Sequence, residues 1–347
     1  MRPFRKNVAI AIDGGGIRGV MVAKALTMLE RELGRPLHEV ARLTVGTSTG
    51  SILAAGIASG LDAQRLFEMY QSLGTQIFKK TLASRFWFFR GYRYSRKPLE
   101  AHLREALKDK TLGDLWNARP STALVVTTFD LVSNYTRFLK SWKPQYQDWP
   151  VVKAVLASSA APTFFPVLDG RYSDGGVGSY NNPCFMAAFE LAHYLKWNPK
   201  ETTLLSLGTG RSREHIKVGD PDKYSALQWI PHVMETLSED ATDQQVHLVK
   251  AMYPGLDFRR YQIIMDKPIG LDDPSHIPLL IQYGETMGAN ILNDELDPLL
   301  KTRLDPAPTM NAAATRSASR RQTSRSGSPH GSRSHTRTKS ARAPRKR

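Results

Sequence analysis

A serine lies at the centre of GTSTG, Gly46–Gly50, which is the only G-x-S-x-G pattern in the chain. It directly follows a short apolar run, Leu43–Val45, and precedes the small-residue segment SILAAGIASG, which is typical of a buried helix. A serine on such a strand-to-helix turn presents its hydroxyl outward, and the flanking glycines leave room around it. The positive end of the following helix favours negative charge there. We therefore predict that Ser48 is a nucleophile for acyl transfer, although a turn that only caps a helix is the plainer alternative.

Three consecutive glycines lie in DGGGIRG, Asp13–Gly19, between a predicted strand at Val8–Ile12 and a predicted helix at Gly19–Leu33. Their spacing matches G-x-G-x-x-G, the pattern of dinucleotide-binding folds, which also need an acidic residue at the end of the next strand. Residues 46–50, after the next predicted strand, contain no acid. Consecutive backbone N–H groups can instead bind the oxyanion of a tetrahedral intermediate. The loop therefore favours acyl transfer over nucleotide binding.

A serine nucleophile needs a base, and the residues leave two kinds open. Five of the nine histidines follow Ser48 at separations compatible with a Ser–Asp–His triad, although none has a recognisable signature; they are His193, His215, His232, His247 and His276. The other candidate is Asp174, which with Gly175 and Gly176 follows GRYS, a predicted short strand. A carboxylate beside the serine can act directly as the base where burial raises its pKa. The same Asp-Gly-Gly sequence also fits a simple tight turn.

The elements that must position these residues alternate between short buried strands and longer helical patterns. Besides Val8–Ile12 and Leu43–Val45, apolar runs predict strands at Leu124–Thr128 and Leu204–Leu207. Such alternation is typical of a mostly parallel sheet covered by helices on both faces. The predicted fold class is therefore α/β.

The composition excludes several classes of protein. A single cysteine, Cys184, rules out an internal disulfide and a cysteine-rich zinc site, and we expect it to be a small core residue. No apolar run approaches the roughly 18 residues that a membrane-spanning helix needs. The N-terminal apolar run Val8–Ile12 is too short for a secretory leader. We expect a soluble, cytoplasmic protein.

The net charge of +16 is concentrated at the C-terminal end. Residues 301–347 hold 13 Lys and Arg side chains and one acid, a net charge of +12, whereas the rest hold 35 basic and 31 acidic side chains. Residues 317–347 contain no large apolar side chain and cannot offset the entropy of ordering. The sequence thus predicts a body of residues 1–305 and a disordered basic, Ser/Arg-rich tail of residues 306–347. Such a tail can bind polyanions of any kind, nucleic acid and anionic membrane included.

A second basic stretch, Phe78–Lys97, holds seven basic residues, seven aromatic residues and no acid. Its aromatic side chains can pack into the core beneath a basic rim. They can equally lie against an anionic lipid surface, with the rings at the level of the headgroups. The sequence leaves both interpretations open.

The motifs, taken together, resemble those of the patatin-like phospholipases. The resemblance covers roughly the first 210 residues and depends on motifs in the same order along the chain, which are DGGGIRG (Asp13–Gly19), GTSTG (Gly46–Gly50), ASSAAPTFFP (Ala157–Pro166), DGG (Asp174–Gly176), NNP (Asn181–Pro183) and SLGTG (Ser206–Gly210). As a set these motifs are highly specific. The resemblance implies a three-layer α/β/α domain that hydrolyses lipid acyl esters.

The same resemblance assigns roles to individual residues. It implies a dyad without histidine, in which Ser48 is the nucleophile and Asp174 the general base, and it implies no metal and no cofactor. Arg18 falls on a basic position that can hold the loop or a phosphate. The implied oxyanion hole is lined by Gly14, Gly15 and Gly16, and the supporting turn residues are Gly46, Gly50, Gly175 and Gly176. NNP would begin a helix, with Asn182 as its N-cap and Pro183 in its first turn.

Several functional alternatives remain beside a phospholipase or lysophospholipase. One is the same enzyme as a nucleotide-activated, membrane-degrading effector of antiphage defence, for which the turn GTGRSRE, Gly208–Glu214, is a weak anion-binding candidate. Another is a polyanion-binding interaction protein with a vestigial hydrolase fold. Peripheral contact with an anionic membrane would use Phe78–Lys97 and the tail.

Overall fold

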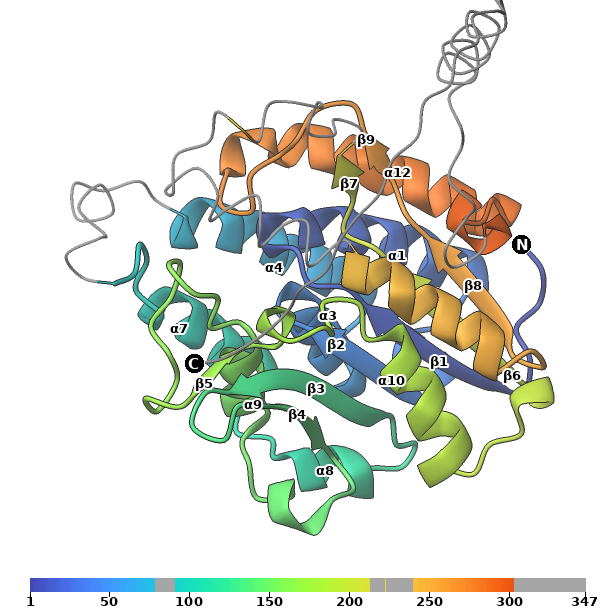
Figure 1. Cartoon of the computed structure of the whole chain (residues 1–347), viewed down its shortest axis with the longest axis horizontal. Helices are drawn as coiled ribbons and strands as arrows, with labels where there is room; N and C mark the ends of the chain where they lie inside the picture. The colour runs from blue at the N-terminus through green and yellow to red at the C-terminus, as the bar shows by residue number, and fades with distance from the viewer. Residues whose placement is uncertain (79–90, 213–221, 223–239, 303–347) are drawn as a thin grey trace, which may run out of the picture. The chain divides into compact units, whose positions relative to one another are not determined.

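The computed structural model describes residues 1–78, 91–212, 222 and 240–302 (Figure 1). The predicted tail at 306–347 lies outside these residues, so the division of the chain near residue 305 stays a prediction. Most of the basic aromatic stretch Phe78–Lys97 also lies outside them. None of the helices in the described ranges is long and apolar enough to cross a membrane.

A seven-stranded sheet forms the centre of the described fold. Its strands are β1 (Asn7–Ile12), β2 (Leu43–Thr47), β3 (Ala123–Asp130), β4 (Tyr135–Lys140), β5 (Tyr172–Asp174), β6 (Thr202–Leu207) and β8 (Asp257–Tyr261). The main path is β4-β3-β2-β1-β6-β8, and β5 pairs with β3 beside this path. Only β4 and β5 run antiparallel to their neighbour β3, so the sheet is mostly parallel. The four strands expected from apolar runs are confirmed as β1, β2, β3 and β6.

Helices cover both faces of this sheet because its buried strands are apolar on both sides. In β1, Ile10 and Ile12 belong to one core cluster, and Ala9 and Ala11 belong to the other. The helices on the first face are α1 (Gly19–Leu33), α3 (Thr49–Ala58), α4 (Ala63–Ile77), α7 (Lys97–Leu107), α9 (Val151–Ser158) and α12 (Ile277–Asn293). The second face carries α10 (Cys184–Phe189) and the helical residues 240–252. The predicted three-layer α/β/α fold is confirmed.

Shorter elements connect these layers. They are the helices α2 (Leu37–Val40) and α8 (Leu112–Asn117), a π-helix (Glu190–Tyr194), the paired strands β7 (Arg211–Ser212) and β9 (Ile264–Met265), and 3₁₀ helices at Gly16–Arg18, Pro144–Tyr146, Gly175–Val177, Pro199–Glu201, Pro274–His276 and Pro298–Lys301. The 3₁₀ turn Gly175–Val177 directly follows β5, and the 3₁₀ turn Gly16–Arg18 begins four residues after the end of β1.

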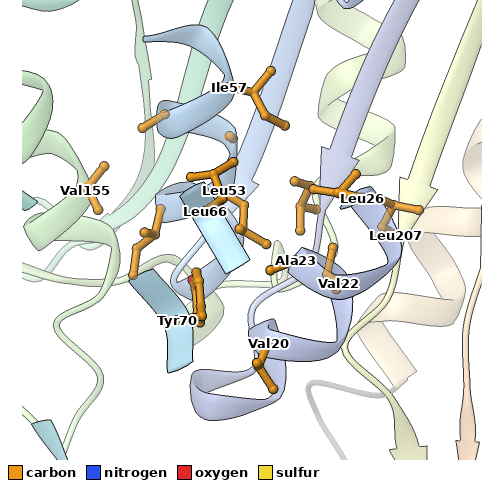
Figure 2. Close-up of a cluster of buried hydrophobic side chains, with 14 of the residues drawn as sticks. Val20, Val22, Ala23, Leu26, Leu53, Ile57, Leu66, Tyr70, Val155 and Leu207 are labelled. Atoms are coloured by element: carbon orange, nitrogen blue, oxygen red, sulfur yellow. The ribbon is translucent and has the colours of Figure 1, made fainter. Parts of the chain in front are cut away.

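A dense apolar cluster fixes α1, α3 and α4 on the sheet (Figure 2). Leu26 of α1, Leu53 of α3 and Leu66 of α4 are fully buried there, together with Leu207 of β6. Full burial of such a side chain contributes about 1.5–3 kcal/mol. Because α1 follows the glycine loop and α3 follows GTSTG, this cluster also fixes the two loops that carry the candidate catalytic groups.

Candidate active site

Strand register brings the glycine loop and GTSTG together. β1 and β2 are parallel neighbours in which Ile12 pairs with Gly46, so the segments that follow them leave the sheet side by side. Gly50 lies so close to β1 that a Cβ atom there would overlap the carbonyl oxygen of Ile12. A Cβ atom on Gly46 would overlap the backbone of residue 50. Both glycines of the pattern therefore permit a close approach between backbones.

Ser48 occupies a strained turn between β2 and α3. Its φ of 52° and ψ of −122° place a non-glycine residue in a region that costs energy and needs support from its surroundings. The support comes from two sides. The Ser48 N–H donates to the Ser158 hydroxyl at 2.8 Å. On α4, the buried Tyr70 hydroxyl lies 2.6 Å from the Thr49 hydroxyl and donates to the Thr49 carbonyl at 2.7 Å.

Asp174 reaches the serine through the pairing of β5 with β3. One edge of β3 is occupied by β4, so β2 and β5 share the other edge. On that edge Thr47 pairs with Thr127, and Asp174 pairs with the next residue, Thr128. The end of β2 and the end of β5 thus meet, with Ser48 just beyond one of them. The strand expected at GRYS is shifted by the structure to Tyr172–Asp174, so the aspartate itself ends the strand.

The environment of the Asp174 carboxylate suits a base. The residue is only 6% exposed, and desolvation raises its pKa from the ordinary 3.8 to about 6. The nearby Ser48 side chain and the Gly176 N–H, which donates to the carboxylate at 2.8 Å, oppose this shift without cancelling it. Within the described ranges no cationic side chain pairs with Asp174. The carboxylate is therefore buried, in contact with the serine and not neutralised by an ion pair.

The first glycine of the loop lies against the serine, but its N–H group is engaged. A Cβ atom on Gly14 would lie 3.2 Å from the Ser48 Cβ. The Gly14 N–H donates to the Asn181 carbonyl at 2.9 Å, and the Gly14 carbonyl accepts from the Thr209 hydroxyl at 2.6 Å. Gly14 can therefore offer close approach to a substrate, but it offers no free backbone donor.

Within the loop Gly14–Gly16, Gly15 and Gly16 are the glycines whose N–H groups find no acceptor among the described residues. Gly16 has a φ of +56°, which favours glycine, and a Cβ atom there would overlap the Leu271 carbonyl oxygen. A Cβ atom on Gly15 would overlap the Thr209 side chain. Both residues are partly exposed, as is Ser48. This geometry leaves the Gly15 and Gly16 N–H groups available as backbone donors.

The remaining turn glycines pack around Asp174. A Cβ atom on Gly175 would overlap the Thr127 hydroxyl, and one on Gly176 would lie 3.1 Å from the Asn181 side-chain oxygen. Asn181 thus contacts both the DGG turn and the glycine loop.

The helix after NNP begins one residue later than its motif suggests. Its first residue is Cys184 and its N-cap is Pro183, whereas Asn182 and Pro183 were the expected N-cap and first helical residue. The Asn182 side chain still caps the chain, since it accepts the Cys184 N–H at 3.0 Å.

A comparison with family models matches residues 10–188 to a family described as Patatin-like phospholipase. This chain belongs to the patatin-like phospholipase family. The matched range includes the glycine loop, GTSTG with Ser48, and the DGG turn with Asp174.

Curated relatives of this chain are named as phospholipases. The chain is 31% identical over 215 residues to a "cGAMP-activated phospholipase" of Pseudomonas aeruginosa, covering 58% of this chain and 61% of that protein. It is 26% identical over 249 residues to an "Intracellular phospholipase A2" of Caenorhabditis elegans, covering 70% of this chain and 22% of that protein. The chain thus spans less than two thirds of these relatives. VipD from Legionella pneumophila aligns over 84% of this chain and 67% of its own, with 14% identity and a TM-score of 0.42.

In this patatin-like chain, Arg18 binds backbone. Its guanidinium donates to the Ile269 carbonyl at 2.8 Å, and the neighbouring Ile17 N–H donates to the Leu271 carbonyl at 2.9 Å. These contacts fasten the glycine loop to the segment after β9. Of the two roles expected for Arg18, holding the loop is the one that these contacts support.

A buried ion pair that the sequence did not reveal anchors the start of the glycine loop. Arg260 of β8 donates to both Asp13 carboxylate oxygens, at 2.8 and 2.6 Å, and to the Ser206 hydroxyl at 2.9 Å. Burial alone would lower the pKa of Arg260, but the Asp13 carboxylate raises it above its ordinary value, so the guanidinium stays charged. The partners lie 247 positions apart. No local pattern signals such a pair.

The described histidines that follow Ser48 make no contact with it. The His193 ring packs on Phe189 with centroids 4.7 Å apart, and His276 pairs with Asp273 at 3.1 Å. The described residues show no contact between His247 and the serine either, and His215 and His232 lie outside the described ranges. Cys184 is buried and desolvation raises its pKa to about 12, as suits a core thiol.

No metal site emerges in the part of the chain that is described, and the described cation of the GTGRSRE turn is paired. No group of three or more His, Cys, Asp and Glu side chains there could hold a metal ion. Arg211, the cation of the GTGRSRE turn, pairs with Asp243 at 3.3 Å, and Arg213 lies outside the described ranges.

Tyr94 of the basic aromatic stretch is buried against Phe78, with ring centroids 5.3 Å apart.

Proposed function

We propose that this protein hydrolyses fatty-acyl esters of phospholipids or lysophospholipids, with Ser48 as nucleophile and Asp174 as general base. One observation carries the proposal. The Ser48 side chain, on a strained strand-to-helix turn, lies close enough to the buried Asp174 carboxylate to lower its pKa, and desolvation nevertheless raises that pKa to about 6. A nucleophilic hydroxyl and a matched base in contact are what acyl transfer through an acyl-serine requires.

In the first step, the Ser48 oxygen attacks the acyl carbonyl carbon while its proton passes to Asp174. The carbonyl oxygen becomes an oxyanion, which the Gly15 and Gly16 N–H groups stabilise; their lack of an acceptor among the described residues supports this role. When the intermediate collapses, the ester bond breaks and Asp174 gives its proton to the departing alkoxide. The product is an acyl-serine and a lysolipid or other alcohol.

In the second step, water attacks the acyl-serine and Asp174 takes a proton from that water. A second oxyanion forms and collapses, the fatty acid leaves, and the proton returns to Ser48. A base with a pKa of about 6 is ionised at neutral pH and stronger than an exposed aspartate. The raised pKa therefore supports both proton transfers.

Fatty-acid release from phospholipid vesicles tests this proposal. We expect release by the wild-type protein and none by Ser48→Ala. The matched control is Ser59→Ala, which removes a hydroxyl from the other end of α3; that hydroxyl has no hydrogen-bond partner, so its loss should leave activity unchanged. Normal release by Ser48→Ala would contradict the proposal.

A second candidate concerns the control of this activity. Relatives from Pseudomonas aeruginosa and Vibrio cholerae, 31% and 30% identical to this chain, are named "cGAMP-activated phospholipase". These names favour activation by a cyclic dinucleotide here as well. Vesicle hydrolysis measured with and without cGAMP tests the idea, and a rate that cGAMP leaves unchanged would reject it. The polyanion-binding alternative depends on the tail at 306–347, outside the described residues.

A further inference from the structure

The turn between β3 and β4 exposes a group of apolar side chains. Leu131, Val132 and Tyr135 are 47%, 71% and 67% exposed. Val132 and Tyr135 are the two most exposed large apolar side chains in the described part of the chain. Single exposed apolar residues are ordinary on protein surfaces, but three within five residues form a patch that calls for a physical reason.

This turn is held in place by a buried carboxylate. Asp130, which is fully buried, accepts the N–H groups of Val132 at 3.1 Å and Ser133 at 3.2 Å. The Arg171 guanidinium binds both Asp130 oxygens, at 2.9 and 2.7 Å, and the Leu131 N–H donates to the Arg171 carbonyl at 3.0 Å. The apolar side chains are thus presented on a fixed backbone.

Cations and aromatic rings surround the base of the turn. The Arg137 and Arg171 side chains are 40% and 44% exposed and share the single carboxylate of Asp130, which leaves one net positive charge. The Arg137 guanidinium lies 5.9 Å from the centroid of the Tyr135 ring. An apolar tip above arginine and tyrosine matches the order of a bilayer interface, where apolar groups enter the acyl region and cations meet phosphates.

The turn also projects from the edge of the sheet that carries the candidate active site. β3 is parallel to β2, and Thr47, which precedes Ser48, pairs with Thr127. Leu131 lies four residues past Thr127, so at about 3.3 Å per residue the turn extends roughly 13 Å beyond the end of β2. A bilayer that touches the turn would therefore face the carboxyl edge from which Ser48 emerges.

We propose that residues 131–135 form a membrane-docking tip that inserts Leu131 and Val132 into an anionic phospholipid bilayer. The functional role of this docking rests on the proposed hydrolysis, since the bilayer that binds the tip would contain the phospholipid substrate. The docking itself depends only on the exposed apolar side chains, the fixed turn and the arginines.

Site-specific labelling tests the insertion directly. The chain has one cysteine, Cys184, which is fully buried, so an engineered cysteine can be labelled selectively. An environment-sensitive dye is attached to Val132→Cys, in a full chain that also carries Ser48→Ala so that the bilayer stays intact. The matched control is Met252→Cys, whose native side chain is 56% exposed on the helical residues 240–252. Vesicles contain equal parts of phosphatidylcholine and phosphatidylglycerol.

We expect the emission of the Val132→Cys dye to shift to shorter wavelength when vesicles are added, and that of the Met252→Cys dye to stay unchanged. Binding through the basic tail alone would shift neither dye. Unchanged emission at position 132, or equal shifts at both positions, would overturn the proposal.

Cosedimentation gives a second measurement. Leu131→Ser/Val132→Ser should bind these vesicles about tenfold more weakly than wild type, because two apolar side chains no longer enter the bilayer. The control Leu248→Ser/Met252→Ser should bind normally. An equal loss in both variants would contradict a docking tip. Hydrolysis of a short, water-soluble ester should be the same in wild type and the tip variant. If wild type cleaves no ester but the labelled tip still inserts, the proposed hydrolase fails and the docking stands.

Discussion

Two aspartates on the paired strands β3 and β5 have opposite electrostatic environments. Asp174 is paired with Thr128, and Asp130 is paired with Tyr172, so the carboxylates lie two register positions apart, and both are buried. Desolvation raises the pKa of Asp174 to about 6, whereas the Arg171 guanidinium holds the pKa of Asp130 well below its ordinary range. The two neighbourhoods differ mainly in the presence of cations.

This contrast separates a reactive carboxylate from a structural one. Asp130 accepts hydrogen bonds from two arginines and two backbone N–H groups. These donors stabilise its negative charge, and the carboxylate in turn holds the β3–β4 turn. Asp174 has only the Ser48 side chain and the Gly176 N–H as donors, and its charge is costly where it lies. A buried carboxylate without a cation can gain by taking a proton, which is what a general base does.

The largest effect is expected at the nucleophile. Ser48→Ala should lower vesicle hydrolysis by about 10³-fold or more, since acyl-serine formation is lost. Fatty-acid release measured beside Ser59→Ala provides the comparison. A reduction of only a few fold would mean that another group attacks the ester.

The next largest effect distinguishes the two aspartates directly. Asp174→Asn should lower hydrolysis of a soluble ester by about 10²–10⁴-fold, because the base is lost while the fold is kept. Asp130→Asn should change that rate by less than about threefold, since its carboxylate contacts only the turn and the arginines. Equal losses in both variants would remove the distinction between them.

Combining the two active-site changes sharpens this test. The double variant Ser48→Ala/Asp174→Asn should be no slower than Ser48→Ala alone, because a base without its nucleophile has nothing to activate. Additive losses would show that the two residues act independently.

Stability should change in the opposite direction from activity at Asp174. A carboxyl whose pKa rises from 3.8 to about 6 on folding stabilises the protein fully below pH 3.8, and this contribution is lost as the pH rises through about 6. The loss is about 3 kcal/mol. The free energy of unfolding of Asp174→Asn, measured in urea, should therefore increase relative to wild type by most of this amount between pH 4 and pH 7. A difference that does not change with pH would contradict the raised pKa.

The smallest effect is expected at Asp130. Because its pKa is lowered on folding, its contribution is present above the pKa of the unfolded chain and is lost as the pH falls toward its own lower pKa. Asp130→Asn should lower the thermal midpoint at neutral pH by a few degrees, and the difference from wild type should narrow in acid. Thermal unfolding of both proteins, followed by circular dichroism at neutral and at acidic pH, measures the two midpoints. A midpoint unchanged at neutral pH would mean that the ion pairs of Asp130 with the arginines do not stabilise the fold.

Local patterns predicted the layers of the fold well. Apolar runs gave the strands at β1, β2, β3 and β6, and periodicity gave α1 with the observed bounds, Gly19–Leu33. Each of these signals lies within a short stretch of chain. The antiparallel strand β5 was less well placed, because three residues carry little periodicity.

The site was harder to derive from residues alone. The spacing of GTSTG indicates Ser48, but residue patterns alone leave its base open between histidine and Asp174, and only the family resemblance favours the aspartate. The pairing of Asp13 with Arg260 depends on tertiary structure across 247 positions. The same holds for the contact that engages the Gly14 N–H with the Asn181 carbonyl, which leaves Gly15 and Gly16 as the available donors.

The most direct test of the Ser48–Asp174 dyad is the rate at which a fluorophosphonate labels Ser48 as a function of pH. If Asp174 is the base, wild-type labelling should rise with pH through about 6 as Asp174 ionises, and Asp174→Asn should be labelled slowly at every pH. Fast labelling of Asp174→Asn, with the same pH dependence as wild type, would show that another group activates the serine and would contradict the dyad.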